Sequence, residues 1–259
     1  HALVLRAHQR FYGVAMAPWR AAGAFLLRDY PRIVRSQWRY LLAAAALFLL
    51  PVLLLTFIIP AFPELAYTII DPAQARQMEA MYDPALRERF GRERESDDDF
   101  VMFAYYIRNN TSIGFQTFVG GLAFGLGTVF YLLFNGLFIG AIAGHLTGLG
   151  YIDTFWGFVA GHSAFELTAI MLSGAAGLKL GMALIAPGNY KRRLALRRAM
   201  SQAIKLMYGA AALFVVAAFV EAYWSSIASI PALYKYAVGV LGWIVVALYF
   251  VALGRKHAA

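Results

Sequence analysis

The chain of 259 residues contains no cysteine, which excludes disulfide bridges and thiolate metal sites. Acidic residues are also few: 14 Asp and Glu stand against 23 Lys and Arg, giving a formal net charge of +9. Only 14% of the residues are charged, whereas 61% are hydrophobic, and the mean hydropathy is +0.61. This composition excludes an ordinary soluble domain and is typical of a protein that crosses a membrane several times.

Charge is nearly absent from residues 111–188. These 78 residues carry three formal charges, on Asp153, Glu166 and Lys179, and they hold 16 of the 23 glycines. So much glycine destabilises a helix in water. In lipid the backbone must bond to itself, and small residues let neighbouring helices approach closely. We therefore expect residues 111–188 to form a Gly-rich intramembrane core.

The charges that remain are separated along the chain. Seven basic residues lie in 1–39 beside a single acid, Asp29, and six lie in 188–205 with no acid. Ten of the 14 acids lie in residues 63–100. Because basic flanks stay on the cytoplasmic side, this pattern predicts a multi-pass membrane protein with both termini in the cytoplasm. Nucleic-acid binding is disfavoured, since no soluble domain remains to carry it.

On this pattern the chain divides into six segments. Cytoplasmic or interfacial amphipathic helices are expected at 1–39, the first span at 40–62, and an extracytoplasmic acidic loop at 63–110, with a helix at 73–92. The Gly-rich core at 111–188 precedes a cytoplasmic basic loop at 189–205, and the last two spans and a cytoplasmic tail occupy 206–259. Because the first residue is His1, we expect the native chain to begin upstream.

Two cytoplasmic termini require an even number of spans. The first span and the last two make three, so the Gly-rich core must supply three more, and one of its two apolar runs must cross twice. The preferred turn is Asn135–Gly136, and Gly161–His162 is the rival. The alternative for 111–149 is one long helix kinked at Gly125 or Gly127. The predicted fold is therefore all-α: a polytopic membrane bundle of about six spans, with broken or re-entrant central helices and an amino-terminal interfacial helix.

Glycines in the core recur at a spacing of four residues, which places them on one face of a helix. Such small-residue strips let a partner helix approach the backbone. A partner within the chain is favoured over a second copy, although a homo-oligomer stays open. The predicted packing residues are Gly121, Gly125, Gly136, Gly140, Gly144, Gly177 and Gly181, with Gly148 extending the longest strip.

A few polar residues lie within the apolar runs. His162 and Glu166 are one helical turn apart, and His145, near the end of the preceding helix, could approach them. They could form a structural hydrogen bond, a proton or ion path, or a metal site, which their types allow although no HExxH motif occurs. We interpret Glu221 as a solvated interfacial acid. The candidate polar core is His162, Glu166, His145, Asn135, Asn109 and Asn110, with no catalytic residue, cofactor or metal ligand assigned.

Five motifs in order resemble the signature of the stage II sporulation protein M family, in its longer non-sporulating bacterial branch. The resemblance covers about residues 40–227. The motifs are Asn109–Asn110, Gly120–Thr128, Phe134–Gly140, Gly161–Leu167 and Ser173–Gly181.

The resemblance implies a bacterial inner-membrane protein with a role in an envelope complex. In spore formers the family member is a membrane partner of peptidoglycan-degrading enzymes, and elsewhere the family genes accompany MoxR-type AAA+ ATPases and von Willebrand factor A proteins. We therefore expect a non-enzymatic integral membrane scaffold or regulator, with lipid and protein partners. The alternative is a transporter or channel that uses polar residues of the central helices. An intramembrane metal-dependent hydrolase, which would need His145, His162 and Glu166 to converge, is the third hypothesis.

Overall fold

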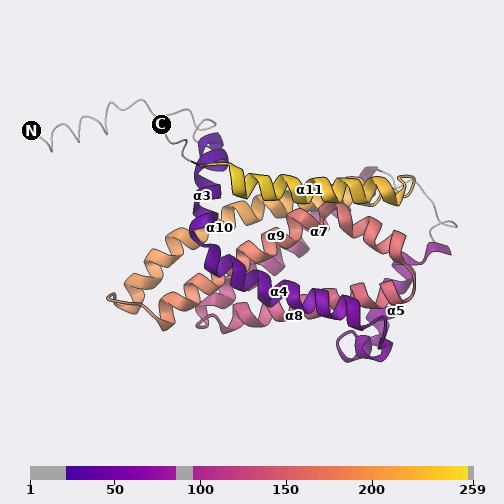
Figure 1. The fold of residues 1–259 in the computed structure, drawn as a ribbon, viewed down its shortest axis with the longest axis horizontal. Coiled ribbons are helices and arrows are strands. Elements are labelled where there is room, and N and C mark those ends of the chain that lie inside the picture. The colour runs from indigo at the N-terminus through magenta and orange to yellow at the C-terminus, as the bar shows by residue number, and fades with distance from the viewer. Residues whose placement is uncertain (1–21, 86–95, 256–259) are drawn as a thin grey trace, which may run out of the picture.

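A computed structural model describes residues 22–85 and 96–255, and every regular element in these residues is a helix (Figure 1). The order along the chain is η1 (Phe25–Asp29), α3 (Tyr30–Ser36), α4 (Trp38–Ile58), η2 (Pro63–Thr68), α5 (Pro72–Tyr82), α7 (Ser96–Val119), η3 (Gly120–Leu122), α8 (Leu126–Gly148), α9 (Ile152–Ile185), α10 (Arg192–Val220), η4 (Glu221–Ser225) and α11 (Ala232–Ala252). The all-α prediction is confirmed. The first half of the predicted helix at 73–92 is observed as α5, which ends at Tyr82, and residues 86–92 lie outside the described ranges.

Five of the described helices are long and apolar enough to cross a membrane: α4, α8, α9, α10 continued by η4, and α11. Helix α7 also runs from one end of the bundle to the other (Figure 1). It is less apolar, because it contains Ser96–Asp99 and Arg108–Asn110. Among the described residues the bundle thus has five apolar candidate spans, and α7 is a more polar helix that begins inside the segment predicted to be a loop.

Both predicted turn positions in the core are wrong. Helix α8 is continuous through Asn135–Gly136, and α9 is continuous through Gly161–His162. The Asn135 side chain donates to the Tyr131 carbonyl oxygen at 2.7 Å, so its polar group is satisfied within the helix. The chain instead reverses between α7 and α8, where Gly125 has φ of 83°, a value that glycine adopts without strain. The run at 111–149 therefore does reverse, but its turn lies earlier than predicted, and α8 is the one candidate span within that run.

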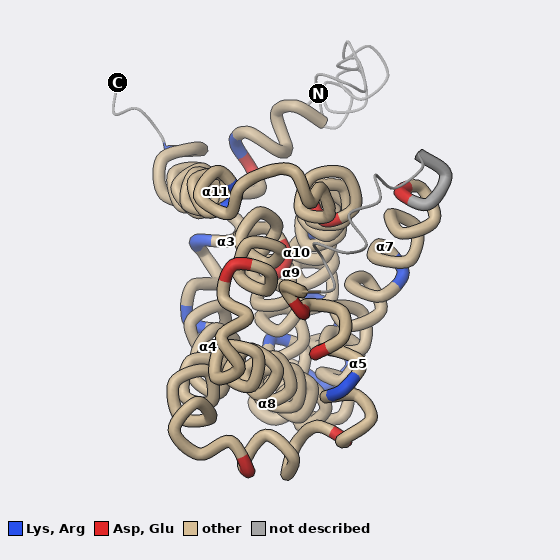
Figure 2. Tube along the Cα trace, turned by 90° about the vertical axis from the view of Figure 1, so that its right-hand side faces the viewer, with Lys and Arg blue, Asp and Glu red and all other residues tan. Residues whose placement is uncertain are grey.

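Helix α9 is the centre of the bundle. It contacts α4, α7, α8, α10 and α11. Of its most apolar 18-residue stretch, 67% is buried inside the protein, against 22–39% of the corresponding stretches in the other four candidate spans. Seen end-on, α9 and α10 lie between the α4–α8 pair on one side and α11 on the other (Figure 2). Side chains on α9 are therefore the ones most removed from lipid.

The longest glycine strip packs against α4 of the same chain. A Cβ added to Gly136 would lie 2.5 Å from the Phe48 carbonyl oxygen, and one added to Gly140 would lie 2.8 Å from the carbonyl oxygens of Pro51 and Val52. These distances are shorter than real Cβ contacts, so the absence of side chains sets how closely α4 and α8 approach.

The shorter strips join the α7–α8 turn to α9. Gly121 lies against the backbone of Gly177, and Gly125 lies against Gly181. Thr128 Oγ1 donates to the Thr117 carbonyl oxygen at 2.7 Å and ties the two sides of the turn together. The turn between α7 and α8 thus packs directly against α9 at the Gly121–Gly177 and Gly125–Gly181 contacts.

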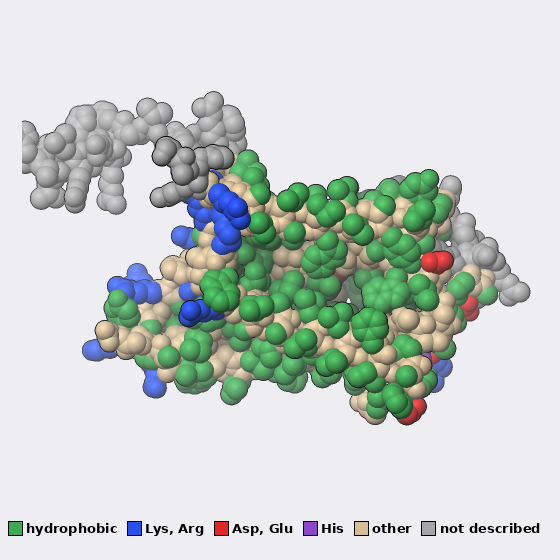
Figure 3. All heavy atoms as spheres, in the orientation of Figure 1, with side chains coloured by type: hydrophobic (Ala, Val, Ile, Leu, Met, Phe, Trp, Pro, Cys, Tyr) green, Lys and Arg blue, Asp and Glu red, His purple; other side chains and the backbone are tan. Residues whose placement is uncertain are grey.

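The two ends of the bundle differ in charge (Figure 3). At the basic end, α3 crosses the bundle end, and Arg35 Nη1 donates to the Leu253 carbonyl oxygen at 2.8 Å at the end of α11. The α9–α10 hairpin projects at the same end (Figure 1). Helix α9 has 34 residues, a length of roughly 50 Å, whereas the hydrocarbon core of a bilayer is about 30 Å thick. The hairpin is therefore long enough to leave the membrane.

Candidate functional site

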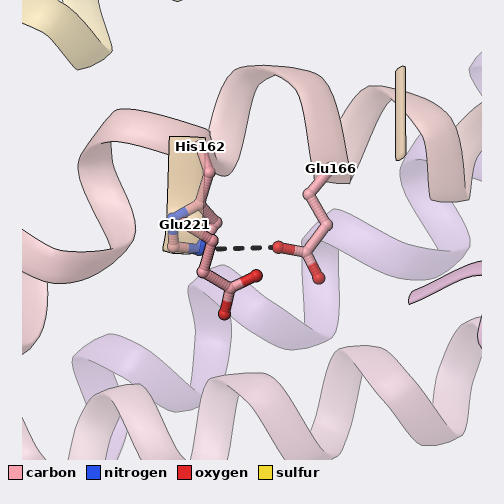
Figure 4. A group of neighbouring side chains, drawn as sticks. All are labelled: His162, Glu166 and Glu221. Atoms are coloured by element: carbon pink, nitrogen blue, oxygen red, sulfur yellow. Dashed lines mark ion pairs between the residues drawn. The ribbon is translucent and has the colours of Figure 1, made fainter. Parts of the chain in front are cut away.

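Three ionisable side chains converge between α9 and η4: His162, Glu166 and Glu221 (Figure 4). His162 Nε2 lies 3.5 Å from Glu166 Oε2, which their spacing of one turn on α9 allows. One ligand atom from each of the three residues lies within 4.8 Å of the others. The predicted pair is therefore joined by a second carboxylate from another helix.

Glu221 is not the solvated interfacial acid that its position near a helix end predicted, because it is only 8% exposed. It begins η4, a π-helical turn that continues α10 through Ser225. A π-helical turn changes which side chains face the neighbouring helix, and such turns are frequent at functional sites. The one available signal in the sequence was a solitary acid in an otherwise apolar run, and solitary acids in membrane helices usually face the protein interior.

Ser225 links the cluster to α11. His162 Nδ1 lies 3.2 Å from Ser225 Oγ, and Lys235 Nζ donates to the Ser225 carbonyl oxygen at 2.7 Å. Lys235 is 2% exposed, so a fourth ionisable group is buried beside the three. Gly161 makes the approach possible, because a Cβ there would lie 3.1 Å from Ser225 Oγ. The residue predicted to break α9 instead lets η4 pack against it.

Three buried polar atoms at this place have no hydrogen bond of normal geometry among the described residues. They are Glu221 Oε2, Asn110 Nδ2 and Trp224 Nε1. The Asn110 amide is nevertheless close enough to interact with the Glu221 carboxylate, and its Oδ1 accepts from Asn109 Nδ2 at 3.1 Å. Of the two predicted residues on α7, Asn110 is thereby placed at the cluster, whereas Asn109 is exposed and contacts it only through Asn110. Buried orphan atoms are uncommon in native proteins and often mark a bound water or ion.

Tyr82, at the end of α5, lies near the cluster on the acidic side. Its carbonyl oxygen accepts from Thr154 Oγ1 at 2.6 Å, which holds α5 against the start of α9. Burial raises the pKa of the Tyr82 phenol well above its ordinary value, and the nearby Tyr106, Glu221 and Glu166 add to this effect. The phenol therefore stays protonated and neutral beside the carboxylates.

The structure does not bring two of the predicted polar residues to the cluster. His145 Nε2 pairs with Glu79 Oε1 at 2.7 Å, which fastens the end of α8 to α5, and Asn135 bonds within α8. His145 is therefore not a member of the group formed by His162 and Glu166, and the convergence of these three residues that the hydrolase hypothesis needs does not occur. The pairing of His145 with Glu79 could not be predicted from the sequence, because the two residues lie 66 positions apart on different helices.

The arrangement is chemically suited to a cation. One imidazole and two carboxylates supply nitrogen and oxygen ligands, and two carboxylates in a low-dielectric interior repel each other unless a proton or a metal ion lies between them. Lys235 supplies one positive charge nearby. The described side chains thus form an acid-rich polar cluster within an apolar bundle.

The helices define a class, a multi-pass helical membrane protein with a buried ionisable cluster between its central helix and the helices beside it. The chain belongs to the stage II sporulation protein M family, whose family model matches residues 40–226. The sequence-based family prediction is thereby confirmed. An uncharacterized protein of Methanocaldococcus jannaschii is 27% identical over 123 residues, which cover 47% of this chain and 69% of that protein. No solved structure matches the chain.

Proposed function

We propose that this protein is a non-enzymatic integral scaffold or regulator of a cell-envelope complex, held in the bacterial cytoplasmic membrane with its basic end and both termini in the cytoplasm. The observation that carries the proposal is the projecting α9–α10 hairpin. A rigid bundle that presents a charged hairpin beyond the bilayer is suited to holding a soluble partner. The charge separation between the two ends supports the orientation.

The hairpin has a charge of one sign. No acid occurs anywhere from residue 167 to residue 220. Its tip is exposed and carries Lys191, Arg192, Arg193, Arg197 and Arg198. At its base, a hollow of about 220 Å³ opens between α4, α9 and α10, and Lys179, Arg198 and Gln202 line it. These features favour an acidic partner surface that places a carboxylate in the hollow.

The partner classes follow from family membership rather than from geometry. The family genes accompany MoxR-type AAA+ ATPases and von Willebrand factor A proteins, so a cytoplasmic ATPase of that type is the partner proposed for the basic end. Anionic lipid headgroups are a further partner for the basic end, because Lys and Arg near the bilayer are attracted to them. A second copy of the chain stays open as a further partner.

Reversing one charge on the hairpin tests the scaffold. We expect Arg197→Glu to weaken co-purification with the MoxR-type ATPase of the same genome about tenfold, because a like charge then faces the acidic surface. The matched control is Arg76→Glu, an exposed arginine on α5 at the opposite end. Equal co-purification of both variants, measured at the same expression level, would contradict the proposal.

A transporter is the second candidate, favoured by the ionisable groups buried between α9, α10 and α11. Proteoliposomes distinguish the two. If the protein is a scaffold, the wild type passes no cations or protons above protein-free vesicles, and His162→Ala weakens the assembly of the complex without changing that flux. A wild-type flux that is lost in a stably folded His162→Ala variant would replace the scaffold with the transporter.

A further inference from the structure

We propose that His162, Glu166 and Glu221 bind a divalent transition-metal cation, with Zn²⁺ as the preferred ion, and that this ion fastens α9 to the end of α10. The inference is independent of the hairpin and of any partner. It starts from the convergence of one nitrogen and two oxygen ligands within 4.8 Å of one another.

The distances are close to those of a zinc site. Neighbouring ligands on a tetrahedral zinc ion lie about 3.3 Å apart, because its bonds to nitrogen and oxygen are about 2.0 Å long. His162 Nε2 and Glu166 Oε2 already lie 3.5 Å apart. The Glu221 carboxylate lies beside this pair (Figure 4), and its ligand oxygen is within 4.8 Å of the other two ligand atoms.

Glu221 itself points to a ligand. It is only 8% exposed, and its Oε2 has no hydrogen bond of normal geometry among the described residues. An isolated carboxylate oxygen is costly to bury, and the protein reduces that cost by adding a proton or a cation. A divalent ion carries enough charge to neutralise both carboxylates at once, and it would also draw their oxygens toward one centre.

The histidine is already oriented for metal binding. Its Nδ1 faces Ser225 Oγ at 3.2 Å, so Nδ1–H can donate to the serine and leave the Nε2 lone pair directed at Glu166. Metal-bound histidines usually donate their second ring nitrogen to such a partner, which fixes the tautomer. Ser225 is in turn held by Lys235, which donates to its carbonyl oxygen. The supporting contacts therefore reach from α9 through η4 to α11.

The donor atoms of these side chains indicate which cation the site would bind. Imidazole suits zinc and other transition metals, whereas Ca²⁺ needs six to eight oxygen ligands and Mg²⁺ retains most of its water. Three protein ligands leave a fourth position for water, and the Asn110 amide, which interacts with the Glu221 carboxylate, would help to hold that ligand in place. The arrangement thus favours Zn²⁺ over Mg²⁺ and Ca²⁺.

The test uses the full chain in detergent micelles, stripped with a chelator and titrated with Zn²⁺. We expect one Zn²⁺ per chain by elemental analysis, and a rise in Tm of about 5 °C at a zinc concentration near one hundred times the Kd. Glu221→Gln keeps the shape of the side chain but removes the charge, so it should weaken binding at least tenfold. Mg²⁺ and Ca²⁺ should leave the Tm unchanged.

Glu79→Gln is the matched control, because Glu79 also pairs with a buried histidine, His145, yet lies outside the cluster. It should bind one Zn²⁺ as the wild type does. Co²⁺ gives a second measurement: its visible spectrum should show histidine ligation in the wild type and lose it in His162→Asn. Circular dichroism shows whether His162→Asn folds. If it does not, the Co²⁺ spectrum of Glu221→Gln is compared with that of the wild type instead.

The proposal is overturned if the wild type binds no stoichiometric zinc, or if Glu221→Gln binds it as tightly as Glu79→Gln. Failure of the scaffold proposal has a different signature, since it concerns partner binding at Arg197 and not the metal content of the purified chain.

Discussion

Replacing Gly140 with valine is expected to lower the free energy of unfolding by about 3 kcal/mol, because overpacking a tight interface costs this much. A Cβ at residue 140 would lie 2.8 Å from the carbonyl oxygens of both Pro51 and Val52. Both are backbone atoms and cannot rotate away, so α4 and α8 must separate. Their separation would also weaken the contacts of Gly136 and Gly144 with α4, which belong to the same strip.

Alanine substitutions give the controlled measurement. Gly140→Ala should be clearly less stable than Gly157→Ala, since a Cβ at residue 157 would lie 3.6 Å from its nearest neighbour, an ordinary contact. Both residues are glycines in membrane helices, so the gain in helix propensity cancels in the comparison. Unfolding in detergent, followed by circular dichroism, measures the difference. Equal stability of the two alanine variants would contradict close backbone packing as the determinant of the α4–α8 interface.

The glycine strip shows what the sequence could predict. Spacing by four residues indicated a close helix contact, and the structure has that contact. The partner could not be predicted, because α4 contributes backbone carbonyls of Phe48, Pro51 and Val52 to it, and any residue type has a carbonyl. A strip of small residues identifies one side of an interface and leaves the other side undetermined.

The turn was misplaced for a related reason. Asn135–Gly136 is a strong turn signal in water, but in a membrane helix the asparagine can bond to the preceding turn of its own helix. The actual turn uses Gly120, Gly121 and Gly125, which were interpreted only as packing residues or as a kink. Hydropathy cannot separate these cases, because the run is apolar on both sides of the turn.

The site was half predictable. A spacing of four residues on one helix placed His162 beside Glu166, which the structure has. Glu221, Ser225 and Lys235 were missed, because they come from other helices and meet the pair only through tertiary packing around Gly161. The π-helical turn that begins at Glu221 has no pattern in the sequence that distinguishes it from the α-helix before it.

Removing the amino group of Lys235 is expected to have the second large effect. Lys235 is 2% exposed, and its Nζ donates to the Ser225 carbonyl oxygen at 2.7 Å. Lys235→Met keeps most of the side-chain volume, yet it leaves that carbonyl without its donor and removes the amino group held next to Ser225, the residue that contacts His162. Breaking a buried charged contact in this way costs about 3–5 kcal/mol. Lys191→Met, at an exposed lysine, should change the unfolding free energy by less than about 0.5 kcal/mol.

A double variant separates the two causes of this loss. If Lys235 acts mainly by balancing the carboxylates, Glu221→Gln should restore part of the stability lost in Lys235→Met, because it removes one of the charges left unbalanced. If Lys235 acts only by bonding Ser225, the two losses should add, since the carbonyl stays unpaired whatever residue 221 carries. Thermal unfolding of the four proteins in chelator measures the coupling without metal. A Lys235→Met variant as stable as Lys191→Met would show that neither contact contributes to the fold.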